Sequence, residues 1–131
     1  MKTPLSACLA AILFTVAVPG RAHALTAAEI AGDYSGTSTS TLSDGRVVTG
    51  YASVSLRRNG KIFATMFDYD VGSGYKGRYQ FITDGAIVGK ISSGELAGFV
   101  TRDGKNLTLD LLIKTNYGAV IPQRITLTAL P

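Results

Sequence analysis

The sequence predicts an all-β protein, an eight-stranded antiparallel up-and-down (meander) β-barrel with a short N-terminal helical turn. Turn dipeptides of the Asx-Gly type recur along the chain, and these are the strongest short-range signal for hairpins. Apolar and polar residues alternate between the turns, as expected for strands with one buried face. After residue 24 only the segment "LTAAEIAG" has a helical pattern.

The first 24 residues have the composition of a secretory signal peptide. Lys2 is followed by an apolar run from Leu5 to Val18, and Ala22-His23-Ala24 is a small-x-small cleavage site. "LSAC" (Leu5–Cys8) matches a bacterial lipobox, but here the apolar run follows the cysteine instead of ending at it. We therefore expect cleavage after Ala24, and a bacterial protein that is periplasmic or secreted.

The chain from residue 25 to 131 is expected to form a single domain that lacks several reactive side chains. The one cysteine, Cys8, and the one histidine, His23, belong to the leader, and the chain has no tryptophan. Catalysis that needs an imidazole or a thiol is excluded on this reading, and so are zinc sites made of Cys and His. We expect no enzymatic activity, no catalytic or metal-binding residue and no cofactor.

The charge of the expected mature chain is close to balanced. Of the thirteen Lys and Arg residues, Lys2 and Arg21 are lost with the leader, which leaves eleven bases against nine acids. Such a charge does not favour nucleic acid as a partner. The leader run is too short for a stable span of about 20 residues, and no stable membrane span is expected in the mature protein.

The expected elements follow from the turn signals in chain order. Thr26 and Glu29 have the spacing of a capping box, and Gly32 is the expected end of that single helical turn. Four Asx-Gly turns and three further glycine-containing bends divide the rest into eight strands. The expected strands are 32–42, 46–58, 61–70, 77–83, 86–93, 95–102, 106–115 and 119–130.

The second hairpin gives a register that can be checked. If Asn59-Gly60 is a two-residue turn, Arg58 faces Lys61 and one face of the hairpin is apolar. The cross-strand pairs on that face are then Leu56–Phe63, Val54–Thr65, Ala52–Phe67 and Gly50–Tyr69. In the strand 106–115, Leu107, Leu109, Leu111 and Ile113 likewise share one face.

Short turns at every step favour a meander that closes into a barrel, because a Greek key needs a long crossover. Closure also removes unpaired sheet edges. A two-sheet sandwich or half-open barrel is the alternative. A barrel of eight strands has room for side chains or for one small ligand.

A helical turn followed by Gly32-Asp33-Tyr34 at the start of an eight-stranded meander resembles the calycins, the superfamily of lipocalins and avidins. In that superfamily the first strand opens with Gly-x-Trp, and the aromatic ring stacks on a basic residue from the end of the barrel. The resemblance implies a barrel-closing pair of Tyr34 and Arg124, and an internal ligand site.

The stretch "DYDVGSGYKGRY" (68–79) combines acids, glycines, bases and tyrosines. A calcium loop would need further oxygen ligands and a glutamate at its end, and a nucleic-acid surface would need more bases. A bend between two strands explains the stretch better. As the longest expected connection it is the candidate recognition loop, with Gly72, Gly74, Tyr75 and Lys76 at its centre.

Inward-facing aromatic residues give two hypotheses for the interior. They either fill the barrel or line a pocket for a small hydrophobic ligand. The candidate ligand-binding residues are Phe63, Thr65, Phe67, Tyr69, Tyr79 and Phe81.

The sequence thus predicts an exported, non-enzymatic binding protein that holds a small hydrophobic ligand in the barrel or binds a protein partner through its loops. One alternative is an inhibitor of a secreted protease that uses "LTAAEIAG" as an inserting segment. Another is a structural or assembly factor of the envelope that has no ligand.

Overall fold

The computed structural model describes residues 25–42, 44–68 and 71–131. The leader expected at residues 1–24 therefore lies outside the described residues. The strands are β1 (Gly32–Thr41), β2 (Val47–Leu56), β3 (Lys61–Asp68), β4 (Val71–Thr83), β5 (Ala86–Ile91), β6 (Gly94–Asp103), β7 (Asn106–Thr115) and β8 (Val120–Ala129).

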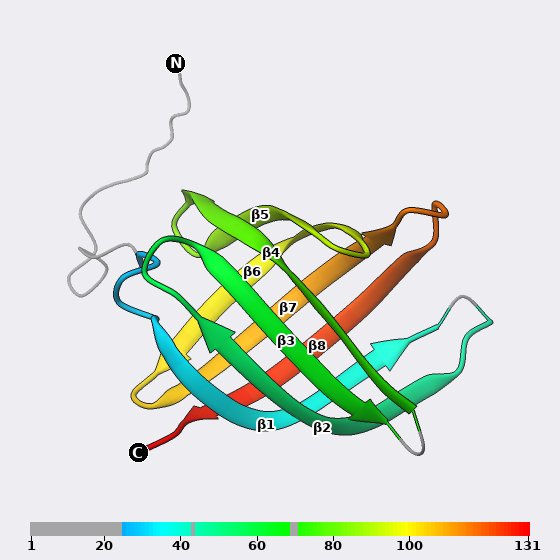
Figure 1. Cartoon of the computed structure of the whole chain (residues 1–131), viewed down its shortest axis with the longest axis horizontal. Coiled ribbons are helices and arrows are strands. Elements are labelled where there is room, and N and C mark those ends of the chain that lie inside the picture. Colours follow the sequence, from blue (N-terminus) through cyan, green and yellow to red (C-terminus); the bar gives the residue numbers. More distant parts are fainter. Residues whose placement is uncertain (1–24, 43, 69–70) are drawn as a thin grey trace, which may run out of the picture.

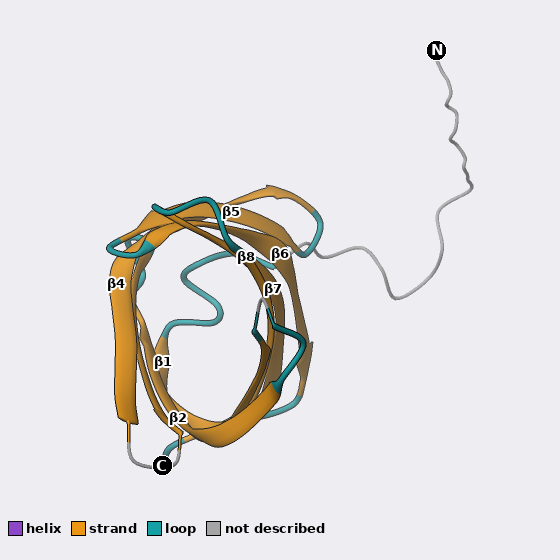
Figure 2. Ribbon diagram, turned by 90° about the vertical axis from the view of Figure 1, so that its right-hand side faces the viewer, coloured by secondary structure: helices purple, strands orange, loops and turns teal. Residues whose placement is uncertain are grey.

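Each strand pairs antiparallel with the next one in the chain, and β8 pairs with β1 to close the barrel (Figure 1). Viewed end-on, the strands form one continuous ring (Figure 2). The closed eight-stranded antiparallel barrel is confirmed and the two-sheet sandwich is wrong. The described residues contain no helix, and the helical turn expected before β1 stays a prediction.

Most strands have the expected bounds to within two residues, because the Asx-Gly dipeptides mark the turns. The fourth strand is the exception, since it was expected to begin at residue 77 and begins at Val71. The glycines of this segment had indicated a bend. At Gly74, however, a Cβ would lie 2.5 Å from the carbonyl oxygen of Ala64, so the glycine allows close strand pairing inside the sheet.

The predicted register of the β2–β3 hairpin is wrong by one residue. Leu56 pairs with Ile62, not with Phe63, because the loop has three residues, Arg58 to Gly60. The amide of Gly60 donates to the carbonyl of Arg57, and Gly60 has a φ of 90°, the left-handed conformation of a bulged hairpin loop.

A register shift of one residue exchanges the two faces of a strand. The side chains of β3 that face the interior are therefore Ile62, Ala64 and Met66, all buried. In β7 the predicted alternation is confirmed, and Leu107, Leu109, Leu111 and Ile113 are all buried.

The two ends of the barrel differ. At one end, before β1, residues 26–30 form a hydrogen-bonded turn, and Ile30 is 1% exposed against the core. The other end carries the turns that join β1 to β2 and β7 to β8, at the right of Figure 1. The core extends along the barrel from Ile30 as far as Met66, Tyr75 and Ile113, and beyond these residues the second end is open.

Candidate ligand site at the open end of the barrel

A cavity of about 290 Å³ lies inside the open end of the barrel. Six strands, β1 to β4, β7 and β8, contribute residues to its wall, because side chains at alternate positions of a strand share a face. None of the described residues that line it is charged. They are Ser38, Ser40, Leu42, Val48, Gly50, Met66, Gly74, Tyr75, Ser93, Ile113, Thr115, Ile121 and Gln123.

Three polar side chains from different strands form a hydrogen-bonded chain across this cavity. The hydroxyl of Tyr75 on β4 donates to Oε1 of Gln123 on β8 at 3.0 Å. Nε2 of Gln123 donates to Oγ of Ser40 on β1 at 3.2 Å. This chain adds donors and acceptors to a mainly apolar wall, to which Ser38, Ser93 and Thr115 also contribute, as in sites that orient a small ligand.

All three polar groups are uncharged at neutral pH, because the Gln123 amide and the Ser40 hydroxyl do not ionise and burial opposes ionisation of Tyr75. Gln123 is 7% exposed and Tyr75 is 8% exposed. Removal of the Tyr75 hydroxyl from water raises its pKa, because the phenolate would lose its solvation. The arrangement can therefore exchange hydrogen bonds with a neutral ligand, and it offers no charge to compensate an ionised one.

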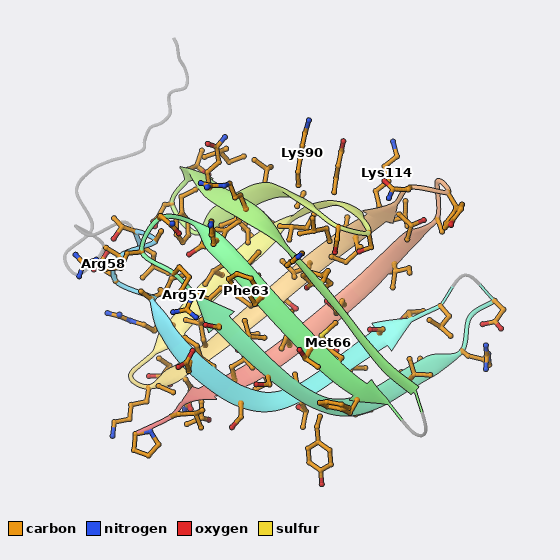
Figure 3. The ribbon with its side chains drawn as sticks, in the orientation of Figure 1. Arg57, Arg58, Phe63, Met66, Lys90 and Lys114 are labelled. Carbon is orange, nitrogen blue, oxygen red and sulfur yellow. The ribbon has the colours of Figure 1, made fainter. Side chains whose placement is uncertain are left out.

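Three of the predicted ligand-binding residues do not face the interior. Phe63, Thr65 and Phe67 lie on the outer face of β3 because of the register shift, and the two phenylalanines are 41% and 53% exposed. The guanidinium of Arg57 lies over the ring of Phe63, 5.8 Å from its centre (Figure 3). The placement of these three side chains inside the barrel was therefore wrong, and Tyr69 lies outside the described residues.

The other two predicted residues face inward, but away from the cavity. Tyr79 is 5% exposed, and its ring meets that of Phe81 edge to face at 5.9 Å. Neither lines the cavity at the open end. The Tyr79 hydroxyl is buried and has no hydrogen-bond partner, and burial, together with the nearby Tyr34, raises the pKa of Tyr79 to about 12.

The predicted barrel-closing pair is not formed. The Tyr34 hydroxyl donates to the carbonyl of Ile30 at 2.8 Å inside the closed end. Arg124 faces outward, opposite Thr39 of β1, and its Nε donates to Asp110 at 2.6 Å. Burial raises the pKa of Tyr34, and the positive charge of Arg102 partly opposes this rise. Arg102 also donates to the carbonyl of Glu29 at 3.3 Å.

The predicted recognition loop is part of a strand. Gly72, Gly74, Tyr75 and Lys76 all pair with β3, so the idea of a long loop here is wrong. Tyr75 points inward to Gln123, and Lys76 is exposed on the outer face. The residue of this candidate site that the sequence pattern did not single out is Gln123. It is a polar residue among the apolar inward positions Ile121, Ile125 and Leu127, and this exception is the signal that could have found it.

Three further observations bear on the kind of site. In the part of the chain that the structure describes, no group of three or more His, Cys, Asp or Glu residues could hold a metal ion. No helix among these residues is long and apolar enough to cross a bilayer. The chain matches no protein-family model, and none of the curated proteins matches it in sequence.

Proposed function

We propose that the protein is an exported, non-enzymatic binding protein that holds one small neutral ligand at the open end of its barrel. The observation that carries the proposal is the chain Tyr75–Gln123–Ser40, which lies in the wall of a cavity without charged residues. The cavity is at the small end of the range for ligand sites, about 300–1,000 Å³. The ligand therefore combines an apolar body with one or two hydrogen-bonding groups.

We propose further that the chain is a calycin-like barrel whose leader is removed after Ala24, and that residues 26–30 act as a helical turn closing one end. Two observations support this reading: the strands follow one another in meander order, and the end of the barrel before β1 is plugged by Ile30. The packing of Ile30, Leu25 and Ala27 against the core favours a binding protein over an inhibitor that inserts this segment.

The proposal is tested with 2-naphthol and naphthalene, which differ by one hydroxyl. Because the protein has no tryptophan, the fluorescence of either probe can be followed without interference from indole side chains. We expect saturable binding of both, with 2-naphthol about fivefold tighter, since one hydrogen bond contributes about 1 kcal/mol. Binding of naphthalene measures contact with the apolar wall, and the additional affinity of 2-naphthol measures its hydrogen bond to the polar chain.

Substitution Gln123→Leu should remove the preference for 2-naphthol and leave naphthalene bound. Asn106→Leu is the matched control, because Asn106 is an exposed amide at the first residue of β7, outside the cavity. Native mass spectrometry of protein isolated from a bacterial periplasm would then identify the natural ligand. An absence of saturable binding of both probes would refute the proposal, and so would equal effects of the two substitutions.

A further inference from the structure

The outer face of strands β5, β6 and β7 carries two shallow hollows that the proposed function does not use. Their volumes are about 860 and 580 Å³. Both include Val88, Ala97 and Leu112, so the two hollows join over these residues into one groove, which we call the outer groove.

The floor of the outer groove is apolar. Val88 pairs with Ala97, Ala97 with Leu112, and Leu112 with Pro122, so four apolar residues lie side by side on four strands. Leu112 is 52% exposed, and so is Val120, the first residue of β8. Phe99, which is two residues after Ala97 on the same face of β6, is 60% exposed. Contiguous exposed apolar surface of this kind marks a binding surface more often than scattered single residues do.

The edge of the outer groove is basic. One row of cross-strand partners runs from Arg78 through Lys90 and Glu95 to Lys114, and all four line the larger hollow. Arg78 and Lys90 are directly opposite, and like charges in that position destabilise a sheet. Lys90 and Lys114 project from the same side of the barrel (Figure 3).

The one acid of this row, Glu95, is the direct cross-strand partner of both Lys90 and Lys114. Among the described residues, Arg78, Lys90 and Lys114 make no ion pair, whereas Arg124 and Asp110, on the same side of the barrel, pair at 2.6 Å. A row with three bases and one acid keeps a net positive charge beside an apolar floor. That charge is complementary to an anionic group attached to an apolar body.

We propose that the outer groove binds one molecule of an anionic amphiphile, an acyl chain with a carboxylate or phosphate head. The chain lies over Val88, Ala97 and Leu112, and the head lies at Arg78, Lys90 and Lys114. From the row of Lys90 to the row of Ala86 the groove extends along β5 for about 13 Å, four residue steps of a strand. This ligand differs from that of the open end, where no described lining residue is charged.

The test uses nuclear magnetic resonance of ¹⁵N-labelled protein titrated with dodecanoate below its micelle concentration. Dodecyl maltoside has the same chain without the charge, and butanoate has the same head without the chain. We expect saturable shifts of β5, β6 and β7 amides with dodecanoate, binding at least tenfold tighter than either comparison compound, and weaker binding at high salt.

Paired substitutions distinguish binding of the anionic head at specific residues from an effect of the protein's net charge. Lys114→Glu should weaken dodecanoate binding about tenfold, while Lys105→Glu, the same change in the β6–β7 turn, should have little effect. Val120→Asn should weaken binding severalfold, and Val47→Asn is its control because Val47 is likewise an exposed valine at the first position of a strand, β2.

Several outcomes would overturn this inference. One is a set of shifts centred on Ser40, Tyr75 and Gln123, which would place the acid at the open end. Another is equal weakening by Lys114→Glu and Lys105→Glu, and a third is no effect of Val120→Asn. Binding to phosphatidylglycerol vesicles without saturable binding of free dodecanoate would assign the face to a membrane surface instead.

Discussion

Tyr79 has the one buried side-chain hydroxyl, among the described residues, that lacks a hydrogen-bond partner. A buried polar group without a partner costs about 1–3 kcal/mol. Its neighbour Tyr34, at the same end of the barrel, has a partner in the carbonyl of Ile30. The hydroxyl of Tyr34 therefore contributes a hydrogen bond to the folded state, whereas the hydroxyl of Tyr79 lowers its stability.

Substitution Tyr79→Phe should therefore leave the free energy of unfolding unchanged at neutral pH or raise it by up to about 1 kcal/mol. At alkaline pH the difference should grow. Burial raises the pKa of Tyr79 to about 12, so the unfolded chain ionises first, and stability of the wild type falls as the pH rises from about 10 towards 12. Urea unfolding followed from pH 7 to 11.5 measures both effects.

Tyr51→Phe is the control for this prediction, because Tyr51 is 76% exposed on the outer face of β2. Its alkaline stability profile should follow the wild type. A loss of more than about 1 kcal/mol on Tyr79→Phe at neutral pH would contradict the prediction and indicate a bound water or ligand on the hydroxyl.

At the scale of elements, three hairpins of the barrel share one kind of loop. The loops after Leu42, Arg57 and Thr115 each have three residues and end in a glycine with a φ near 90°. In each, the amide of the glycine donates to the carbonyl of the residue before the loop, at 2.9 to 3.0 Å. These loops set the register of β1–β2, β2–β3 and β7–β8.

Gly118 isolates the backbone requirement of such a loop, because a Cβ there would meet nothing within 4 Å. Gly118→Val should cost about 1–2 kcal/mol, since a left-handed conformation is costly for a residue with a Cβ and most of all for a branched one. Gly118→Asn should cost clearly less, because asparagine tolerates this conformation. Urea unfolding of the two variants measures the difference, and equal losses would show that the loop does not depend on its backbone conformation.

These loops also explain what the sequence could and could not predict about the elements. Asn59-Gly60 marks the position of a hairpin, but the same letters fit a two-residue turn and a three-residue loop. The faces of β3 follow from that choice, and with them the position of Phe63, Thr65 and Phe67. The bounds of the strands other than β4 did not depend on it and were predicted to within two residues.

The candidate site was harder to predict than the fold, since it depends on which residues meet across the interior. Tyr75 and Gln123 are 48 positions apart and come together only because β4 and β8 face each other through the open end. The glycines around Tyr75 indicated a bend, so neither its place in a strand nor its inward orientation was predicted. In β8, Arg124 was predicted to face Tyr34 in the barrel-closing pair, but it faces outward and its neighbour Gln123 faces inward.

At the scale of the whole molecule, the barrel has one plugged end and one open end, and the two should be independent. The plug is held by Ile30, which is 1% exposed, and by the bond from Tyr34 to its carbonyl. The candidate ligand site is at the opposite end. Stability and ligand binding should therefore be separable by mutation.

Ile30→Ala should lower the free energy of unfolding by about 2–4 kcal/mol, because it leaves a void beneath the turn. Val47→Ala is the control, since Val47 is 61% exposed and such a change usually stays within about 0.5 kcal/mol. Urea unfolding gives the stabilities, and 2-naphthol affinity under native conditions should be the same for both variants. A loss below about 0.5 kcal/mol for Ile30→Ala would mean that the N-terminal turn is not part of the core, and the segment would then be available to a partner such as a protease.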